Sequence, residues 1–262
     1  MTSTPVHEPK PTFIDVDGRR IAIRHRGARP GRATVMFLPG YRSDMMGMKA
    51  TAIDRDCAAR GLGCLRLDYS GTGESAGAFA DGTLELWLEE VLAVVDQAAP
   101  DGHIVIVGSS MGGWLAVLAA LRRPQRIGAL LGIAAAPDFT NWGYSAEEKA
   151  AIARHGRLEQ FNPNGPGSSV THRGFWQSGE MLLLLDAPIE LAIPVRLLHG
   201  VDDTTVPVTV AMKLLEQLAS SNAQLRLIKG GGHNLSEPHE IDAILSDLAQ
   251  LVELVDLAED AP

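Results

Sequence analysis

Short apolar runs alternate with amphipathic stretches along most of the chain. This pattern predicts a mostly parallel β-sheet with helices on both of its faces. The apolar runs place strands at residues 34–38, 65–68, 104–107, 127–134, 195–198 and 224–228. Apolar residues at helical spacing place helices at residues 48–60, 84–98, 114–121, 207–218 and 238–254. Two more strands, at residues 12–16 and 20–25, flank Asp17-Gly18 and predict an antiparallel hairpin at the start of the chain.

The alternation stops between about residues 137 and 191. Ser145 to Glu148 form a capping box, which predicts a helix that runs to about Gln160. Residues 161–169 are rich in Pro, Gly and Asn and are therefore expected to be irregular. We interpret residues 1–262 as a single domain and residues 137–191 as a small cap inserted over a cleft. The alternative is an ordinary pair of connecting helices.

Composition narrows the class of protein. The chain has 262 residues, of which 45% are hydrophobic and 21% charged, and this suits one globular domain with a well-buried core. A net charge of −9 argues against binding to nucleic acid or to anionic lipid. No apolar run approaches the ~20 residues that a membrane-spanning helix needs.

The N-terminal segment and the cysteines bear on the compartment. Residues 1–11 show neither the apolar stretch of a secretory signal nor the Arg-rich pattern of a transit peptide. Cys57 and Cys64 are too few for a disulfide framework, so each is expected to be a small buried apolar residue. On these grounds we expect a cytoplasmic location.

The pentad Gly108-Ser109-Ser110-Met111-Gly112 is the strongest chemical signal in the chain. An apolar strand leads into it, and a helix-forming run follows at once. Strand, sharp turn and helix form the context of a nucleophile elbow, whose glycines leave room for a strained turn that projects the serine into a cleft. The sequence therefore predicts Ser110 as the nucleophile.

A second pentad, Gly73-Glu74-Ser75-Ala76-Gly77, has the same pattern in a different context. It follows a strand-like run, but residues 78–82 read as a loop and the next helix pattern starts only near Thr83. Ser75 would therefore lack the helix N-terminus and the fixed backbone N–H group that an elbow provides. We interpret this pentad as a glycine-rich turn.

A serine hydroxyl needs a base, and the base needs a carboxylate that orients it. His233 lies in a glycine-rich loop between the last expected strand and the last expected helix, from which it can reach the carboxyl end of a central strand. The other histidines are expected to be structural or solvent-exposed, with His172 as a candidate for substrate contact. Asp203 is the predicted acid, since it also lies in a loop after a strand, and Asp202 is its rival.

The negative charge that develops on the substrate oxygen needs two backbone donors. One is expected to be the N–H of Met111, directly after the nucleophile. The other is expected to be the N–H of Tyr41, because Gly40 lets this part of the chain approach the site closely.

These residues together resemble the α/β-hydrolase superfamily. In that superfamily the nucleophile, acid and base follow one another along the chain in the order of Ser110, Asp203 and His233. Residues 37–45, 67–71, 107–114 and 196–200 are similar to a mitochondrial branch of palmitoyl-protein thioesterases and acyl-glucuronide esterases. The resemblance implies the α/β-hydrolase fold and assigns the three catalytic roles to the same residues. It is weakest in the cap, and the Gly231-Gly232 pair and the missing transit segment depart from this branch, so the substrate does not carry over.

The expected reaction is two-step acyl transfer on a small-molecule acyl ester or thioester. No cofactor fingerprint or metal-ligand cluster is found in the sequence, so we expect neither a cofactor nor a metal. Apolar residues could line an acyl pocket or simply pack the cap against the core: Phe139, Trp142, Tyr144, Phe161, Phe175, Trp176, Leu182 to Leu185, Met45, Met46 and Met48. The alternatives are a carbon–carbon bond hydrolase or peptidase on the same triad, and a non-catalytic binding protein on this fold. The oligomeric state is not predicted.

Overall fold

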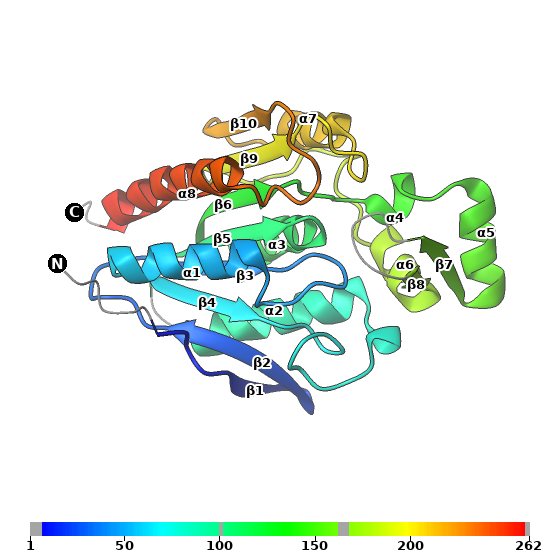
Figure 1. Cartoon of the computed structure of the whole chain (residues 1–262), viewed down its shortest axis with the longest axis horizontal. Helices are drawn as coiled ribbons and strands as arrows, with labels where there is room; N and C mark the ends of the chain where they lie inside the picture. Colours follow the sequence, from blue (N-terminus) through cyan, green and yellow to red (C-terminus); the bar gives the residue numbers. More distant parts are fainter. Residues whose placement is uncertain (1–6, 100–101, 162–167, 260–262) are drawn as a thin grey trace.

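The computed structural model describes residues 7–99, 102–161 and 168–259. Its main feature is an eight-stranded sheet with the strand order β1-β2-β4-β3-β5-β6-β9-β10 (Figure 1). The hairpin β1–β2 is antiparallel and pairs antiparallel with β4, whereas the remaining pairs are parallel. The strands of this sheet are β1 Thr12–Val16, β2 Arg19–Arg26, β3 Thr34–Leu38, β4 Gly63–Leu67, β5 Ile104–Ser109, β6 Ile127–Ile133, β9 Val195–Gly200 and β10 Ala223–Ile228.

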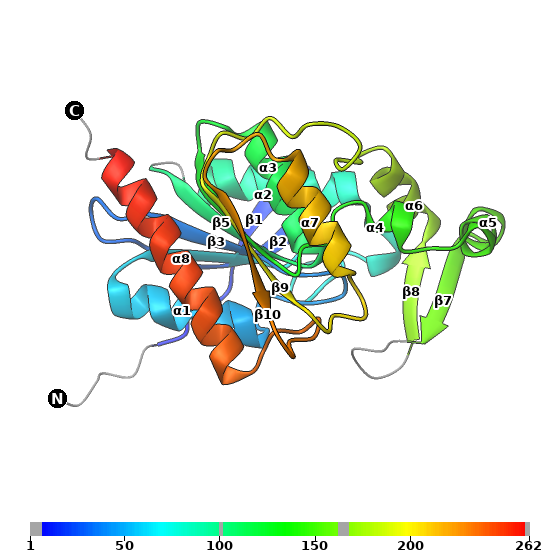
Figure 2. The same ribbon diagram turned by 90° about the horizontal axis from the view of Figure 1, so that it is seen from above.

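Helices cover both faces of the sheet (Figure 2). Helices α1 and α8 pack on one face, and α2, α3 and α7 pack on the other, each over a separate apolar core. The central strands β4 and β5 are buried along their whole length, because helices lie on both of their sides. These helices are α1 Met48–Arg60, α2 Leu84–Ala98, α3 Met111–Arg122, α7 Val208–Gln217 and α8 Pro238–Glu259.

The segment between β6 and β9 has structure of its own. It contains α4 Phe139–Trp142, α5 Ala146–His155, the antiparallel pair β7 Arg157–Phe161 and β8 Ser168–His172, and α6 Arg173–Glu180. These elements lie beyond the carboxyl ends of the parallel strands, to the right in Figure 1.

The predicted element pattern is confirmed, with corrections between residues 145 and 169. The strand at residues 34–38 and the helices at residues 48–60 and 84–98 have the predicted bounds. The capping box at Ser145 and Glu148 is present, but α5 ends at His155, because Gly156 takes a left-handed conformation (φ 78°) and ends the helix. The chain then enters β7, so the prediction of helix to Gln160 is wrong there. The expectation that residues 161–169 are irregular is also wrong at both ends, because Phe161 ends β7 and pairs with Ser168, which begins β8. Residues 162–167 lie outside the described residues.

Two further sequence predictions can be compared with the structure. Cys57 and Cys64 are both buried free thiols. Among the helices within residues 7–99, 102–161 and 168–259, none is both long and apolar enough to cross a membrane.

Candidate active site

Ser110 occupies the sharp turn between β5 and α3. Its backbone lies at φ 55° and ψ −119°, a strained conformation for a residue with a side chain. A Cβ atom on Gly108 would come within 2.1 Å of the carbonyl oxygen of Gly112, and one on Gly112 would come within 2.1 Å of the carbonyl oxygen of Leu38. Both flanking glycines are therefore required by the close approach of backbone to backbone, as the elbow pattern predicts.

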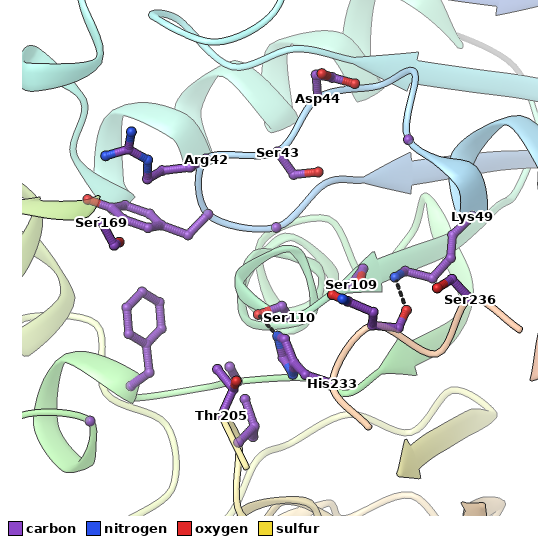
Figure 3. Close-up of a pocket in the computed structure, with 18 of the residues that line it drawn as sticks. Arg42, Ser43, Asp44, Lys49, Ser109, Ser110, Ser169, Thr205, His233 and Ser236 are labelled. Carbon is purple, nitrogen blue, oxygen red and sulfur yellow. Dashed lines mark hydrogen bonds between the residues drawn. The ribbon is translucent and has the colours of Figure 1, made fainter. Parts of the chain in front are cut away.

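The structure brings Ser110, His233 and Asp203 together. His233 Nε2 lies 3.1 Å from Ser110 Oγ, and this contact is drawn in Figure 3. His233 Nδ1 lies 2.8 Å from Asp203 Oδ2. Since a carboxylate only accepts hydrogen bonds, Nδ1 carries the proton, and Nε2 faces the serine hydroxyl as the acceptor.

Asp203 is held as an ionised hydrogen-bond acceptor. Its Oδ1 accepts the backbone N–H groups of Thr205 and Val206, each at 2.8 Å. Burial raises the pKa of Asp203, but the hydrogen bond and positive potential of His233, together with the two N–H groups, outweigh it and hold that pKa below its usual value. Asp202 is exposed, while Asp203 is buried against His233, so the geometry separates the predicted acid from its rival.

A second histidine lies directly behind the acid. His199 is buried. Its Nε2 lies 2.9 Å from the carbonyl oxygen of Val206 and 3.4 Å from Asp203 Oδ2. This agrees with the structural role expected from its position at the end of β9. His172 does not line the cleft described below, and its ring faces Phe79 at 6.3 Å between ring centroids.

The loop that carries His233 is tied to the opposite side of the site. Lys49, at the start of α1, donates a hydrogen bond from Nζ to the carbonyl oxygen of Asn234, the residue after His233 (Figure 3). Burial lowers the pKa of Lys49 from its usual value. The contact joins the first helix to the last loop and restricts the position of the imidazole.

The two expected oxyanion donors belong to residues beside the nucleophile, one next to it in the chain and one in the loop that packs against it. Met111 begins α3, and the first N–H groups of a helix have no acceptor within it. Gly40 lies against the elbow, since a Cβ atom there would sit 3.3 Å from Ser110 Cβ and 3.9 Å from Ser110 Oγ. Tyr41 follows Gly40 directly, so its backbone lies beside the nucleophile.

Ser75 is placed far less favourably for chemistry. Its Oγ donates to the carbonyl oxygen of Asp68 at 2.6 Å and accepts the backbone N–H of Ala22 at 2.8 Å. Both contacts join neighbouring segments of backbone. The prediction that this pentad is a turn agrees with the structure, where no helix follows Ser75 directly.

A cleft of about 740 Å³ opens around Ser110 and His233. Of the predicted apolar residues, Phe139, Trp142, Tyr144 and Met48 line it. Met45, Phe175 and Leu185 are buried in the core instead, and the side chain of Phe161 lies outside the described part of the structure. The sequence reasoning missed the polar lining, which includes Ser43, Lys49, Gln160, Ser169, Asn234 and Ser236. For Asn234 and Ser236 the sequence does contain a signal, because they follow His233 closely in the chain.

The described residues contain no group of three or more His, Cys, Asp or Glu side chains placed to hold a metal ion. The expectation that the reaction needs neither a metal nor a cofactor stays a prediction.

Comparison with known proteins identifies the family. Residues 34–163 match the model of the alpha/beta hydrolase fold family. The chain is 35% identical over 234 residues to a mouse protein, with 88% of this chain and 77% of the mouse protein covered. The chain therefore belongs to the α/β-hydrolase family, and the predicted family, fold and hydrolase class are confirmed.

Within that family, the mouse relative is the mitochondrial palmitoyl-protein thioesterase ABHD10. The solved structure of the mouse alpha/beta hydrolase domain-containing protein 10 superimposes with a TM-score of 0.86 at 31% identity, covering 93% of this chain and 98% of that one. A solved structure of a hydrolase from Agrobacterium vitis S4 gives a TM-score of 0.87 at 35% identity, with 93% and 98% covered. The predicted resemblance to this branch is confirmed.

The same comparison corrects the predicted location. The mammalian relatives with this name are all named mitochondrial, which contradicts the cytoplasmic location expected from residues 1–11. The expectation depended on the pattern of residues 1–11 and on the two cysteines, and neither of these fixes the compartment.

Proposed function

We propose that this protein is a serine hydrolase that cleaves carboxylic esters or thioesters through an acyl-enzyme intermediate. The observation that carries the proposal is the chain of contacts from Ser110 Oγ to His233 Nε2 at 3.1 Å and from His233 Nδ1 to Asp203 Oδ2 at 2.8 Å. These distances suit transfer of the serine proton to an imidazole that a carboxylate orients. The names of the relatives support acyl thioesters as substrates.

In this proposal each residue has a role in the reaction. Ser110 Oγ attacks the carbonyl carbon while His233 Nε2 takes its proton, and Asp203 stabilises the imidazolium that forms. The backbone N–H groups of Tyr41 and Met111 stabilise the negative charge on the carbonyl oxygen. His233 then gives the proton to the leaving oxygen or sulfur, and the acyl group stays on Ser110. Water activated by His233 releases the acid and restores the serine.

Residues 137–191 take the role of a cap in this proposal, as part of one domain. Phe139, Trp142 and Tyr144 from this segment line the cleft beside Ser110 and would contact the acyl chain. The hydroxyl of Tyr41 donates to the carbonyl oxygen of Val170 at 2.9 Å, which joins the segment to the loop after β3. The substrate is a small-molecule acyl compound, and neither nucleic acid nor a membrane span takes part.

A hydrolysis profile tests the proposal. Wild-type protein and Ser110→Ala are assayed on matched oxygen esters, thioesters and acyl glucuronides, with a peptide and a carbon–carbon bond substrate as the alternatives. We expect ester or thioester turnover that depends on Ser110. Turnover of only the peptide or the carbon–carbon substrate, or equal turnover by Ser110→Ala, would contradict the proposal, and a protein with no turnover at all would fit a binding role.

A further inference from the structure

The loop formed by residues 39–45, which we call the oxyanion loop, contains no helix or strand. It follows β3 directly and carries Arg42, Ser43 and Asp44 over the site (Figure 3). Its Gly40 lies against Ser110, so a small shift of this loop would move the backbone N–H of Tyr41 relative to the reacting oxygen. An oxyanion donor acts only when it is already in place, so the position of this loop must be fixed by contacts outside it.

The first end of the oxyanion loop is fixed by Tyr69. This side chain is fully buried, and its hydroxyl donates to the carbonyl oxygen of Pro39 at 3.0 Å. Its ring stacks on Trp87, with ring centroids 5.4 Å apart. Burial raises the pKa of Tyr69 well above its usual value, so the phenol keeps the proton that it donates.

The second end is fixed by the residue before Tyr69. Asp68 Oδ1 accepts the backbone N–H of Met45 at 2.7 Å. Arg66, in β4, donates to the carbonyl oxygen of the same Met45 at 3.0 Å. Because β3 and β4 are parallel neighbours, the loops that leave their carboxyl ends meet at one edge of the sheet. Two consecutive buried residues after β4 therefore hold both ends of the oxyanion loop.

The Ser75 pentad holds Asp68 in turn. The backbone N–H of Glu74 donates to Asp68 Oδ2 at 2.8 Å, and Ser75 Oγ donates to the carbonyl oxygen of Asp68 at 2.6 Å. A Cβ atom on Gly73 would lie 2.0 Å from Asp68 Oδ2, so only glycine lets the loop wrap this carboxylate. The glycine-rich turn thus holds the Asp68 carboxylate and its backbone in place.

We propose that Asp68 and Tyr69 are positioning residues, which with the Ser75 pentad form a brace that sets the oxyanion loop against Ser110. This inference rests on the proposed serine hydrolase function. The brace contacts neither the substrate nor the triad, and it acts through the backbone N–H of Tyr41. Its loss should therefore weaken stabilisation of the transition state more than binding of the substrate.

The test uses Tyr69→Phe, which removes only the hydroxyl, and Asp68→Asn, which keeps the side-chain shape but replaces one acceptor oxygen. With a short p-nitrophenyl ester we expect kcat to fall about tenfold to hundredfold and KM to stay within about twofold. The reason is that moving an oxyanion donor out of place lowers kcat by at most as much as removing that donor. A trifluoromethyl ketone, whose carbon bonds to Ser110 Oγ and whose oxygen becomes an oxyanion, should bind less tightly by a similar factor. Ser220→Ala is the matched control, because its hydroxyl also donates to a backbone carbonyl, that of Ile193 at 2.6 Å, away from the cleft.

The outcomes separate the brace from the function on which it rests. If wild-type protein hydrolyses the ester and Tyr69→Phe lowers only the melting temperature, as Ser220→Ala does, the brace is wrong. If Tyr69→Phe does not fold, Asp68→Asn tests the other end of the loop by the same measurements. If wild-type protein shows neither turnover nor labelling by a fluorophosphonate, the proposed function fails, and the brace with it.

Discussion

Two pentads of the same pattern lie in this chain, and they have opposite surroundings. Ser110 lies between a buried strand and a helix N-terminus, at φ 55°, with its hydroxyl 3.1 Å from an imidazole nitrogen. Ser75 lies in an irregular loop, and its hydroxyl is bonded to backbone groups of Asp68 and Ala22. A hydroxyl whose donor and acceptor capacity is used by the backbone holds two segments together, whereas a hydroxyl that faces a base can react.

The acids near the two serines differ in the same way. Asp203 is buried but accepts hydrogen bonds from His233 and two N–H groups, and its pKa is lowered. Asp68 is also buried and accepts two N–H groups, but no ion pair of its carboxylate is found among the residues that the structure describes, and burial raises its pKa. The comparison teaches that a motif acquires its chemistry from the partners of its serine and from its place between a strand and a helix, since both pentads have the same Gly-x-Ser-x-Gly pattern.

The largest difference between the two pentads should appear when each serine is replaced in turn. Ser110→Ala should lower kcat/KM at least about 10³-fold, because the nucleophile is lost. Ser75→Ala should stay within about tenfold of wild-type activity but lose about 1–3 kcal/mol of unfolding free energy, because two buried backbone groups lose their partner. Ester hydrolysis and urea unfolding measure the two effects. The reverse pattern would make Ser75 the nucleophile.

The next largest effect should come from the acids of the loop after β9. Asp203→Asn should lower kcat about 10²- to 10⁴-fold, because the amide no longer holds the imidazole in the required tautomer. Asp202→Asn should change kcat less than about threefold, since this side chain is exposed. Steady-state kinetics on one ester substrate are sufficient, and equal losses in the two variants would leave the acid unassigned.

The smallest effect is a difference in pH dependence between Asp203 and Asp68. Below the usual value of 3.8, the unfolded chain binds a proton that folded Asp203 does not, so this carboxylate adds stability as pH rises towards 3.8. Folded Asp68 has a raised pKa and keeps its proton above 3.8, so its contribution is lost as pH rises through the folded value. Urea unfolding of Asp203→Asn and Asp68→Asn against wild type, in steps from about pH 3 to 6, should give differences with opposite slopes. Parallel slopes would refute the assigned environments.

Much of the fold follows from local patterns that the sequence displays. The bounds of α1 and α2 are set by apolar spacing and by Gly61 and Thr83 at their ends. The grouping of Ser110, Asp203 and His233 could be predicted because each of them follows a strand, and the carboxyl ends of parallel strands share one edge. The pair β7–β8 could not, since its stability depends on pairing between segments rather than on the periodicity of either.

The brace shows a second limit of sequence reasoning. Its contacts with the oxyanion loop join residues more than 20 positions apart, as with Met45 and Asp68 or Pro39 and Tyr69. Nothing in the local pattern of the Ser75 pentad indicates that it wraps a buried carboxylate. The pairing of β3 with β4 indicates that the two loops meet, but not which atoms bond.

The most direct test of the account is to map the site of covalent labelling by a fluorophosphonate on the folded wild-type protein. Peptide mass spectrometry should find a single phosphonyl adduct on Ser110, formed at a rate that falls strongly in His233→Ala. An adduct on Ser75, or no adduct on Ser110 in folded protein, would contradict the claim that the imidazole activates this hydroxyl.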